Sequence, residues 1–565
     1  MKLLYFILLL LPIRLLSQNR YDIVIDEIMS DPAPRVGLPE YEWIELKNVS
    51  PMPVDLQGWT LNDGSAQSGP MPSFVLQPDS FVIVCSAAAL PAMSVYGKTM
   101  SITGFPSLNN DGETLVLKNI NGVIIHAVGY LSSWFENEVK RAGGWSLEMT
   151  DTKNPCSGSD NWKASKNLTG GTPGRQNSMD APVADEKPPR LKNSYLVDKS
   201  TIVVVFDEPL DSLSGSTTNH YTIDGGLAFN EATVMPPLFD EVQLKVNSPL
   251  TDDILYTIMV DVTDCKGNPI GGSTIVKVGV PKDPQSGDLV INEILFNPRP
   301  NAYDYVEIYN KSNRIVDASA VYIANRNSAG VIASIRKLST MPRYIFPGDY
   351  VVATEDAENL QLNYLEKNPD RVFVVSSMPS YPDDEGDIVL LNLQGDLVDE
   401  VKYSHDWHFR LIANSEGVAL ERIDPNGLSQ DPSNWHSAAS TAGYGTPTYV
   451  NSQLRQLQIA DAAIEIIPKI FSPDNDGRDD IATIQYKADA PGYVATITIF
   501  DVAGRPVRIL INNGSMALSG HWNWDGLNDR GAKLPMGHYI ICTEIFNLQG
   551  RKKRFKNAIV LARRN

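Results

Sequence analysis

The most acidic short segment of the sequence lies near its C-terminal end. Residues 474–480 read Asp-Asn-Asp-Gly-Arg-Asp-Asp, so four carboxylates and one amide surround a glycine that permits a sharp turn. Ca²⁺ prefers such oxygen ligands, and we predict a calcium site at Asp474, Asp476 and Asp480. The segment departs from an EF-hand loop because Arg478 stands at a ligand position and no glutamate closes the loop. A solvated turn is the alternative interpretation.

Two pairs of glutamates form a second candidate site. Glu27 and Glu45 lie in short hydrophobic segments that read as neighbouring strands, and Glu293 and Glu307 repeat the arrangement later in the chain. Paired carboxylates on adjacent strands could hold a cation. Hydrogen bonds from the following loop to these carboxylates explain the pattern equally well, so both interpretations stay open.

Three histidines have side chains of the kind that bind zinc, namely His405, His408 and His436. Joined by loop carboxylates, they would make an exported metal-dependent hydrolase, either a nuclease or phosphoesterase or an accessory of one, and this is the alternative function. The matching segment earlier in the chain keeps only Trp134 as the counterpart of Trp407. This favours tryptophan packing between variable loop positions.

No catalytic motif accompanies these clusters. The sequence has no Gly-x-Ser-x-Gly elbow, no His-Glu-x-x-His and no phosphate-binding loop. Its length of 565 residues predicts about four domains, and its 40 glycines, 38 prolines and short β-branched runs favour many short strands. We therefore predict an all-β protein, a string of four Ig-like β-sandwich domains that leaves no room for a catalytic domain, and we expect no enzyme activity.

The elements that position the glutamates belong to two copies of one module, residues 19–180 and 288–452. The copies share these motifs in the same order: Ile25-Asp26-Glu27-Ile28 with Ile291-Asn292-Glu293-Ile294, residues 43–48 with 305–310, Asn161-Trp162 with Asn434-Trp435, and Gly171-Thr172-Pro173 with Gly445-Thr446-Pro447. A unit used twice in one chain indicates a spacer or a binding module rather than a catalytic domain.

These motifs resemble the bacterial lamin tail domain, an immunoglobulin-like β-sandwich. The family pattern has a hydrophobic-Asn/Asp-Glu-Ile strand, a loop with proline, an aromatic-hydrophobic-Glu strand and a Gly-Trp strand. The first copy keeps the last feature as Gly58-Trp59, whereas the second reads Ala320-Val321. The shared fold predicts that Trp162 and Trp435 are each buried against their own sandwich.

A different β-domain, residues 184–284, lies between the copies. Its strand pattern and its Thr-Asp-x-x-Gly-Asn turn, residues 263–268, resemble the bacterial Ig-like repeats of surface-layer proteins. The resemblance implies a spacer or an adhesion stalk. We expect Asp264 and Asn268 to satisfy backbone donors in that turn.

Residues 463–565 form the fourth domain. Their opening Phe-Ser-Pro-Asp-Asn-Asp-Gly, residues 471–477, is similar to the gliding-associated and sorting C-terminal domains of the Bacteroidetes type IX secretion system, and the strand order is similar to Ig-like domains of flagellar hook-capping proteins. The resemblance implies an export address that the outer-membrane secretion machinery recognises. An unknown surface protein or polysaccharide is the further partner we expect.

The first eighteen residues predict the compartment. Lys2 precedes an apolar run, residues 3–13, that is shorter than the ~20 residues a membrane span needs, so residues 1–18 read as a signal peptide. An N-terminal anchor is the alternative. The formal net charge of −19 disfavours nucleic acid as a partner, and we expect a secreted, cell-surface protein without an integral membrane span.

The four cysteines leave one pairing open. Cys85 and Cys156 share the first module, and their counterparts in the second copy are both non-cysteine, which a disulfide or two unrelated thiols would explain. Cys265 and Cys542 each stand alone in their predicted domains.

Overall fold

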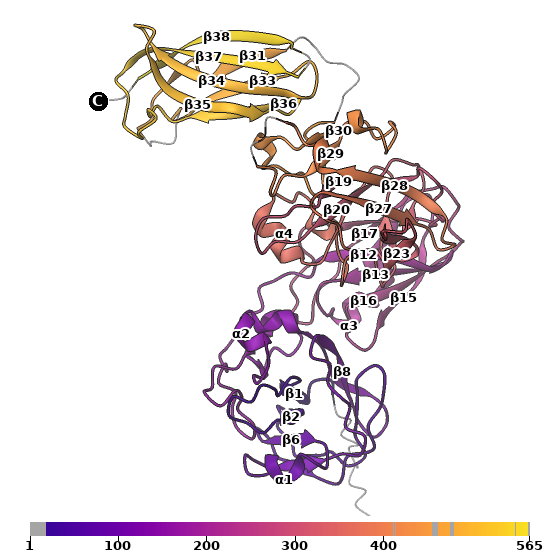
Figure 1. Ribbon diagram of the computed structural model, residues 1–565. Helices are drawn as coiled ribbons and strands as arrows, with labels where there is room; N and C mark the ends of the chain where they lie inside the picture. The colour runs from indigo at the N-terminus through magenta and orange to yellow at the C-terminus, as the bar shows by residue number, and fades with distance from the viewer. Residues whose placement is uncertain are drawn as a thin grey trace, which may run out of the picture. The chain divides into compact units, whose positions relative to one another are not determined.

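Strands dominate the computed structural model, which describes residues 19–410, 412, 414–454, 462–474, 479–548 and 550–562. The predicted signal peptide, residues 1–18, lies outside the described residues. The chain divides into two compact units, residues 1–250 with 256–278 and residues 251–255 with 279–565. Their strands form four sandwiches, each built on two main sheets, which confirms the predicted all-β class (Figure 1).

The first sandwich, in unit one, has a six-stranded sheet and a three-stranded sheet. The larger has the order β11 (Trp162–Ala164), β10 (Leu147–Met149), β1 (Ile23–Met29), β2 (Trp43–Asn48), β6 (Phe81–Cys85) and β7 (Thr99–Ser101). The smaller joins β4 (Thr60–Asn62), β8 (Gly112–Lys118) and β9 (Ile124–Leu131), and a short pair joins β3 (Val54–Asp55) to β5 (Val75–Leu76).

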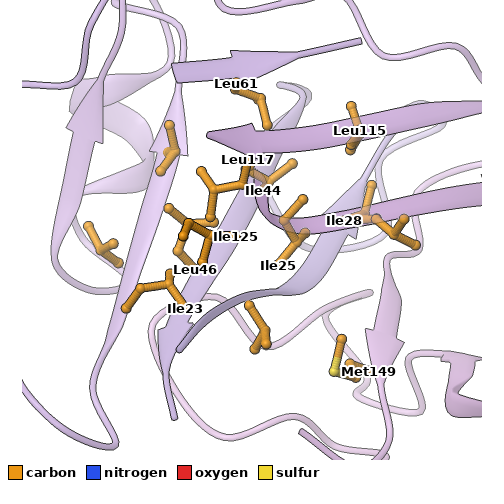
Figure 2. Close-up of a cluster of buried hydrophobic side chains, with 14 of the residues drawn as sticks. Ile23, Ile25, Ile28, Ile44, Leu46, Leu61, Leu115, Leu117, Ile125 and Met149 are labelled. Atoms are coloured by element: carbon orange, nitrogen blue, oxygen red, sulfur yellow. The ribbon is translucent and has the colours of Figure 1, made fainter. Parts of the chain in front are cut away.

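Every second residue of the strands contributes to the core of this sandwich, because successive side chains point to opposite faces of a sheet. Ile44 and Leu46 of β2 point between the sheets and are fully buried. Figure 2 shows them with isoleucines of β1, Leu115 and Leu117 of β8 and Ile125 of β9. The intervening residues of β2, Trp43 and Glu45, therefore face the opposite side of the larger sheet, where they are also buried.

The second sandwich of unit one is the predicted Ig-like domain. Its sheets have the orders β12 (Leu191–Asp198), β13 (Thr201–Phe206), β16 (Glu241–Val246), β15 (Phe229–Met235) and β14 (Tyr221–Ile223), β17 (Tyr256–Val260), β18 (Ile275–Val278). The predicted role of Asp264 is confirmed, since its Oδ1 accepts from the backbone N–H groups of Lys266 (2.8 Å) and Asn268 (2.9 Å). Asn268 acts differently, because its side-chain Nδ2 donates to Asp264 Oδ2 (2.7 Å).

A disulfide joins Cys156 of the first sandwich to Cys265 of the second, 109 residues later, with Cα atoms 6.6 Å apart. Cys85 and Cys156, whose pairing the sequence left open, are therefore not bonded to each other. Cys85 is a buried free thiol in β6, and burial raises its pKa to about 11. Sequence reasoning failed because it sought the partner within one domain, whereas the bond links two.

The third sandwich, in unit two, repeats the first. Its larger sheet has the order β30 (Trp435–Ser437), β29 (Leu420–Arg422), β19 (Leu289–Leu295), β20 (Tyr305–Asn310), β25 (Tyr350–Thr354) and β26 (Val372–Val374). Its smaller sheets are β23 (Ile332–Lys337), β22 (Tyr322–Arg326), β27 (Glu385–Leu391), β28 (Leu397–Ser404) and β21 (Val316–Asp317) with β24 (Tyr344–Ile345). Val321 takes the buried place of Trp59, which explains how the second copy dispenses with the Gly-Trp motif.

The fourth sandwich completes unit two. It pairs β31 (Ala463–Ile467), β33 (Ala482–Lys487) and β36 (Ser519–Trp524) in one sheet, and β32 (Ile470–Phe471), β38 (Lys552–Leu561), β37 (Gly537–Asn547), β34 (Tyr493–Asp501) and β35 (Pro506–Ser515) in the other. Trp524 and Phe471 pack in its core, with ring centroids 5.0 Å apart.

Helices in both units are short. The α-helices are α1 (Leu90–Met93), α2 (Glu138–Arg141), α3 (Ser212–Gly215) and α4 (Ala357–Asn363). Single 3-10 turns are η1 (Ser132–Phe135), η2 (Gly158–Asn161), η3 (Thr218–His220), η4 (Ala318–Ala320), η5 (Pro369–Arg371), η6 (His405–Trp407), η7 (Pro432–Asn434) and η8 (Ser440–Ala442). Within the described ranges, no helix has the length and apolar character to cross a membrane.

Candidate functional site

Each repeated module contains three glutamates side by side, where sequence analysis found two. In the first copy Glu27 of β1 pairs with Glu45 of β2 on one side and with Glu148 of β10 on the other. These three carboxyls, which we call the first glutamate triad, lie on the face of the larger sheet that points away from the core. All three side chains are fully buried.

The last loop of the module covers the first triad. The N–H of Thr172 donates to Glu27 Oε1 (2.7 Å), and its hydroxyl lies 2.9 Å from Glu148 Oε1. The N–H of Gly174 donates to Glu45 Oε2. Each carboxylate of the triad therefore anchors the Gly-Thr-Pro-Gly segment to a different strand of the sheet.

The second copy builds the same arrangement, the second glutamate triad. Glu293 of β19 pairs with Glu307 and Glu421 on the neighbouring strands. The N–H of Thr446 donates to Glu293 Oε1 (2.9 Å), and the N–H of Thr448 donates to Glu307 Oε2 (2.6 Å). The hydrogen-bond interpretation of the paired glutamates is thus confirmed, but the loop is the last of the module and not the one after each strand.

Electrostatics indicate that the triads hold protons. Burial, together with the neighbouring Glu148, raises the pKa of Glu27 to about 8, and burial with Glu421 does the same for Glu293. The hydroxyl of Thr446 lies 2.9 Å from an oxygen of Glu293 and 2.9 Å from an oxygen of Glu421. A hydroxyl has one proton to donate, so satisfying both contacts requires a proton on one of the two carboxyls.

The triads differ from a metal centre in their spacing. Among the described residues, one group of three His, Cys, Asp or Glu side chains has ligand atoms that all lie within 4.8 Å of one another, and it consists of Asp185, Glu208 and Asp264. Neither triad meets this spacing. Each triad instead uses carboxylate oxygens in hydrogen bonds to its covering loop.

The histidine cluster lacks carboxylates at that spacing in the described part of the chain. His405 Nε2 lies 2.9 Å from Ser415 Oγ, and His408 Nδ1 lies 2.9 Å from Ser437 Oγ. Burial, with smaller contributions from the two neighbouring histidines, lowers the pKa of His408 to about 3. His436 is half-buried beside the ring of Phe409, and its Nδ1 lies 2.8 Å from the backbone oxygen of Ser437.

The predicted calcium loop is described only in part. Asp474 Oδ2 accepts a hydrogen bond from Ser472 Oγ (2.9 Å), and the N–H of Ser472 donates to the carbonyl of Asp479 (2.8 Å). Asp480 is also described, but Asp476 lies outside the described residues. The calcium site therefore stays a prediction.

The tryptophan predictions are confirmed. Trp162 and Trp435 are each 3% exposed and belong to the cores of their own sandwiches. Trp134 packs against Trp162 with ring centroids 6.3 Å apart, and Trp407 packs against Trp435 at 6.2 Å. Trp134 and Trp407 are therefore packing residues, as the comparison of the two loops indicated.

Sequence reasoning missed the third glutamate of each triad. A signal was present, because a Leu-Glu pair stands at the same distance before each Asn-Trp motif, at Glu148 and at Glu421. The repeated Gly-Thr-Pro motif was recognised as a marker of duplication and not as the partner of the carboxylates. The Asp185, Glu208 and Asp264 group carries no local motif.

Comparison with solved structures gives similarities at low identity. A DUF4876 family protein from Bacteroides thetaiotaomicron is 13% identical, with 42% of this chain and 91% of that chain covered and a TM-score of 0.19. The S-layer protein rSbsC(31-844) is 13% identical over 66% of this chain and 54% of its own, with a TM-score of 0.16, so this chain spans about half of it. A Ca²⁺-stabilised adhesin of an Antarctic bacterium is 9% identical over 97% and 100%, with a TM-score of 0.12.

Family comparison identifies the repeated modules. No curated protein matches the sequence significantly. The model of the Lamin Tail Domain matches residues 17–132 and 282–405, and these ranges fall on the two copies that contain the glutamate triads. The chain therefore carries two lamin tail domains.

Proposed function

We propose that the protein is a non-catalytic secreted or cell-surface protein whose β-sandwiches act as structural and binding modules. The observation that carries this proposal is the use of the six triad glutamates, which are fully buried and hold the last loop of each lamin tail domain. A general acid or base must reach a substrate proton directly or through one water. Carboxyls covered by their own loop serve the fold instead.

The disulfide between Cys156 and Cys265 supports export. Disulfides persist in oxidising compartments and are rare in the cytosol. We propose that residues 1–18 direct the chain across the inner membrane and that residues 463–565 are then recognised by the outer-membrane secretion machinery of a type IX-like route. A surface protein or polysaccharide is the proposed ligand of the exposed loops.

Truncation tests the export address. A chain that ends before Ile464 should accumulate in the periplasm of the native bacterium, and a fluorescent protein placed ahead of residues 463–565 should reach the surface. Fractionation into periplasm, outer membrane and medium measures both. A truncated chain that still leaves the cell would show that the fourth sandwich is another spacer.

A pull-down tests the binding role. The exported chain, cross-linked on intact cells and purified, should retain a surface protein or polysaccharide through its lamin tail domains. Hydrolysis of nucleic acid or phosphoesters by the purified chain, lost on chelation and restored by metal, would favour the hydrolase alternative instead.

Calcium at Asp474, Asp476 and Asp480 is a further part of this proposal. A cation that binds only the folded loop raises the stability of the fourth sandwich by mass action. Calorimetry of the full chain should show a transition that rises in millimolar Ca²⁺, and Asp476→Ala should remove that rise. A transition that stays fixed would leave the loop as a plain turn.

A further inference from the structure

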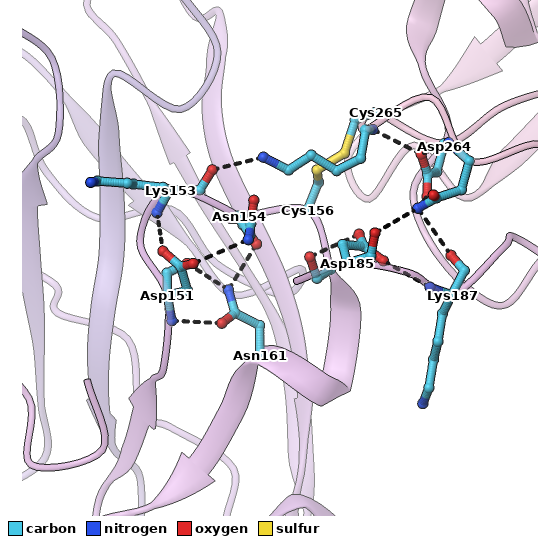
Figure 3. The surroundings of a disulfide bond; sticks show 12 residues. Asp151, Lys153, Asn154, Cys156, Asn161, Asp185, Lys187, Asp264 and Cys265 are labelled. Carbon is cyan, nitrogen blue, oxygen red and sulfur yellow. Dashed lines mark hydrogen bonds between the residues drawn. A yellow bond between two sulfur atoms is a disulfide. The ribbon is translucent and has the colours of Figure 1, made fainter. Parts of the chain in front are cut away.

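Three carboxylates from separate segments of unit one converge beside the disulfide. Asp185 lies in the segment that joins β11 to β12, Glu208 follows β13, and Asp264 lies in the turn before Cys265. Each offers one oxygen, and the three oxygens lie within 4.8 Å of one another. Figure 3 shows Asp185 and Asp264 on the same side of the Cys156–Cys265 bond.

Two of these carboxylates are held in place by neighbouring donors. Asn268 Nδ2 donates to Asp264 Oδ2 (2.7 Å) and to the carbonyl oxygen of Asp185 (3.0 Å). Ser157 Oγ, from the loop of the first lamin tail domain, donates to Asp185 Oδ2 (2.9 Å). The positions of Asp185 and Asp264 are therefore set by the fold itself, and the segment between the two sandwiches is tied to both.

Glu208 supplies the observation that points to a ligand. Its Oε1 is buried and has no hydrogen-bond partner in the described part of the chain. Burial and the carboxylates of Asp185 and Asp264 raise the pKa of Glu208 to about 8. Lys187, the nearby ammonium, pairs with Asp160 instead, and none of the three carboxylates has a salt bridge to Lys or Arg in the described ranges.

We propose that Asp185, Glu208 and Asp264 bind a divalent cation of the Ca²⁺ type. Three carboxylates without nitrogen or sulfur ligands suit a hard cation and not zinc. A cation among these oxygens would neutralise their mutual repulsion and give the buried Glu208 Oε1 a partner. It would fasten the segment after the first lamin tail domain to the Ig-like domain, in parallel with the disulfide.

Calcium binding to the full-length exported chain tests the proposal. All measurements use an Asp476→Ala background, so that the predicted loop of the fourth sandwich cannot contribute. After chelation and dialysis, titration calorimetry with CaCl₂ should show a site that Glu208→Gln removes and Asp185→Asn weakens. Asp207→Asn is the matched control, because Asp207 is an exposed neighbour whose oxygen accepts from the N–H of Arg190 and can still do so as an amide.

Thermal unfolding separates loss of the site from loss of the fold. In chelator, Glu208→Gln should melt at the same temperature as its parent or higher, because the neutral amide replaces a carboxyl that has to take up a proton in the repulsive cluster. In millimolar Ca²⁺ the parent and the Asp207→Asn control should gain several degrees, and Glu208→Gln should gain none. Equal Ca²⁺ stoichiometry in parent and Glu208→Gln, or a parent that gains nothing in Ca²⁺, would overturn the proposal.

Discussion

The two lamin tail domains hold their last loop with the same hydrogen bonds, but the residues around the glutamate triad differ between them. Both use three glutamates and a threonine to hold the last loop. At three positions beside the triad the copies differ: Asp26, His126 and Met149 stand in the first where Asn292, Asp399 and Arg422 stand in the second. Comparison of the two copies therefore shows that the three glutamates and the threonine are needed to hold the loop, whereas the three neighbouring positions can vary.

One required feature is an acceptor for a single backbone group. β1 and β19 each carry a bulge, directly after Ile25 and Ile291, which frees a backbone N–H from the ladder. The N–H of Ile25 donates to His126 Nδ1 (3.0 Å), and the N–H of Ile291 donates to Asp399 Oδ2 (2.8 Å). A histidine in one copy and an aspartate in the other therefore accept the same backbone hydrogen bond at the bulge.

The charge around that acceptor is what varies. In the second copy the fully buried Arg422 lies 3.3 Å from Asp399, and Ser429 bridges the two side chains. In the first copy burial, with a smaller contribution from the guanidinium of Arg20, lowers the pKa of His126 to about 3, so the ring is neutral. Each copy balances its own buried charges, with His126 and Met149 in the first and Asp399 and Arg422 in the second. Combining residues of the two copies in one module should therefore lower its free energy of unfolding.

The largest expected effect comes from breaking that balance. Asp399→Asn leaves the buried Arg422 without a counter-charge, and removing one partner of a buried ion pair costs ~3–5 kcal/mol. Hydrogen exchange of peptides from β29 and β30 should accelerate, while β10 and β11 of the first copy should not change.

The double variant Asp399→His with Arg422→Met is the control. It places the residues of the first copy, equivalent to His126 and Met149, in the second, and we expect it to recover most of the lost stability. If the double variant is as unstable as Asp399→Asn alone, or if the single variant is harmless, the two sets are not equivalent solutions.

The sequence predicted the repeats because strand motifs recur with their spacing intact. It placed Glu27 against Glu45 correctly, since adjacent motif positions become cross-strand neighbours. It could not place Glu148 beside them, because β10 is three residues long and Glu148 follows Glu45 by 103 residues (148 less 45). The disulfide and the Asp185, Glu208 and Asp264 group were missed for a related reason. Both join segments whose proximity depends on the packing of two sandwiches.

The next largest effect tests whether the threonine hydroxyl between the triad carboxyls contributes equally to stability in both copies. Thr172→Val and Thr446→Val keep the size of the side chain but remove the hydroxyl between two buried carboxyls. Leaving buried polar groups unsatisfied costs about 1–3 kcal/mol, and we expect a similar loss in each lamin tail domain by calorimetry. Thr169→Val, at an exposed position of the same loop, should change stability by less than about 0.5 kcal/mol. Unequal losses in the two copies would show that one loop is held mainly by its backbone.

A smaller effect concerns pH. The pKa of Glu27 and of Glu293 is raised to about 8 in the folded chain, so each native module binds more protons than its unfolded form above about pH 4.5. The stability from these protons is complete at low pH and is lost as pH rises through about 8, at up to about 1.4 kcal/mol per pH unit for each carboxyl.

Glutamine variants test this assignment. Glu27→Gln and Glu293→Gln should flatten the fall in melting temperature between pH 5 and pH 8, each in its own transition. Glu136→Gln, at an exposed salt bridge to Lys163, is the control and should leave the pH profile unchanged. A profile that stays steep in both triad variants would place the protons elsewhere.

The smallest effect is a stabilisation that the second copy suggests. Asn292 Nδ2 donates to Glu307 Oε1 (2.8 Å) and to Asn451 Oδ1 (2.6 Å). At the matching place in the first copy, both carboxylate oxygens of Asp26 and the Oε1 of Glu45 are buried and have no hydrogen-bond partner among the described residues. Burial raises the pKa of Asp26 to about 7, against the opposing effect of Lys47. An ionised Asp26 therefore adds a buried charge where the second copy has a donor.

Asp26→Asn should supply that donor and stabilise the first lamin tail domain by about 1 kcal/mol at pH 8. At pH 5 Asp26 is protonated and can donate to Glu45 itself, so the gain should shrink. The reciprocal Asn292→Asp should destabilise the second domain, more at pH 8 than at pH 5. Calorimetry of the full chain at both pH values measures the four differences. A gain from Asp26→Asn that is equal at both pH values, or a loss at both, would mean that ionised Asp26 has a partner of its own and that the two copies are not equivalent at this position.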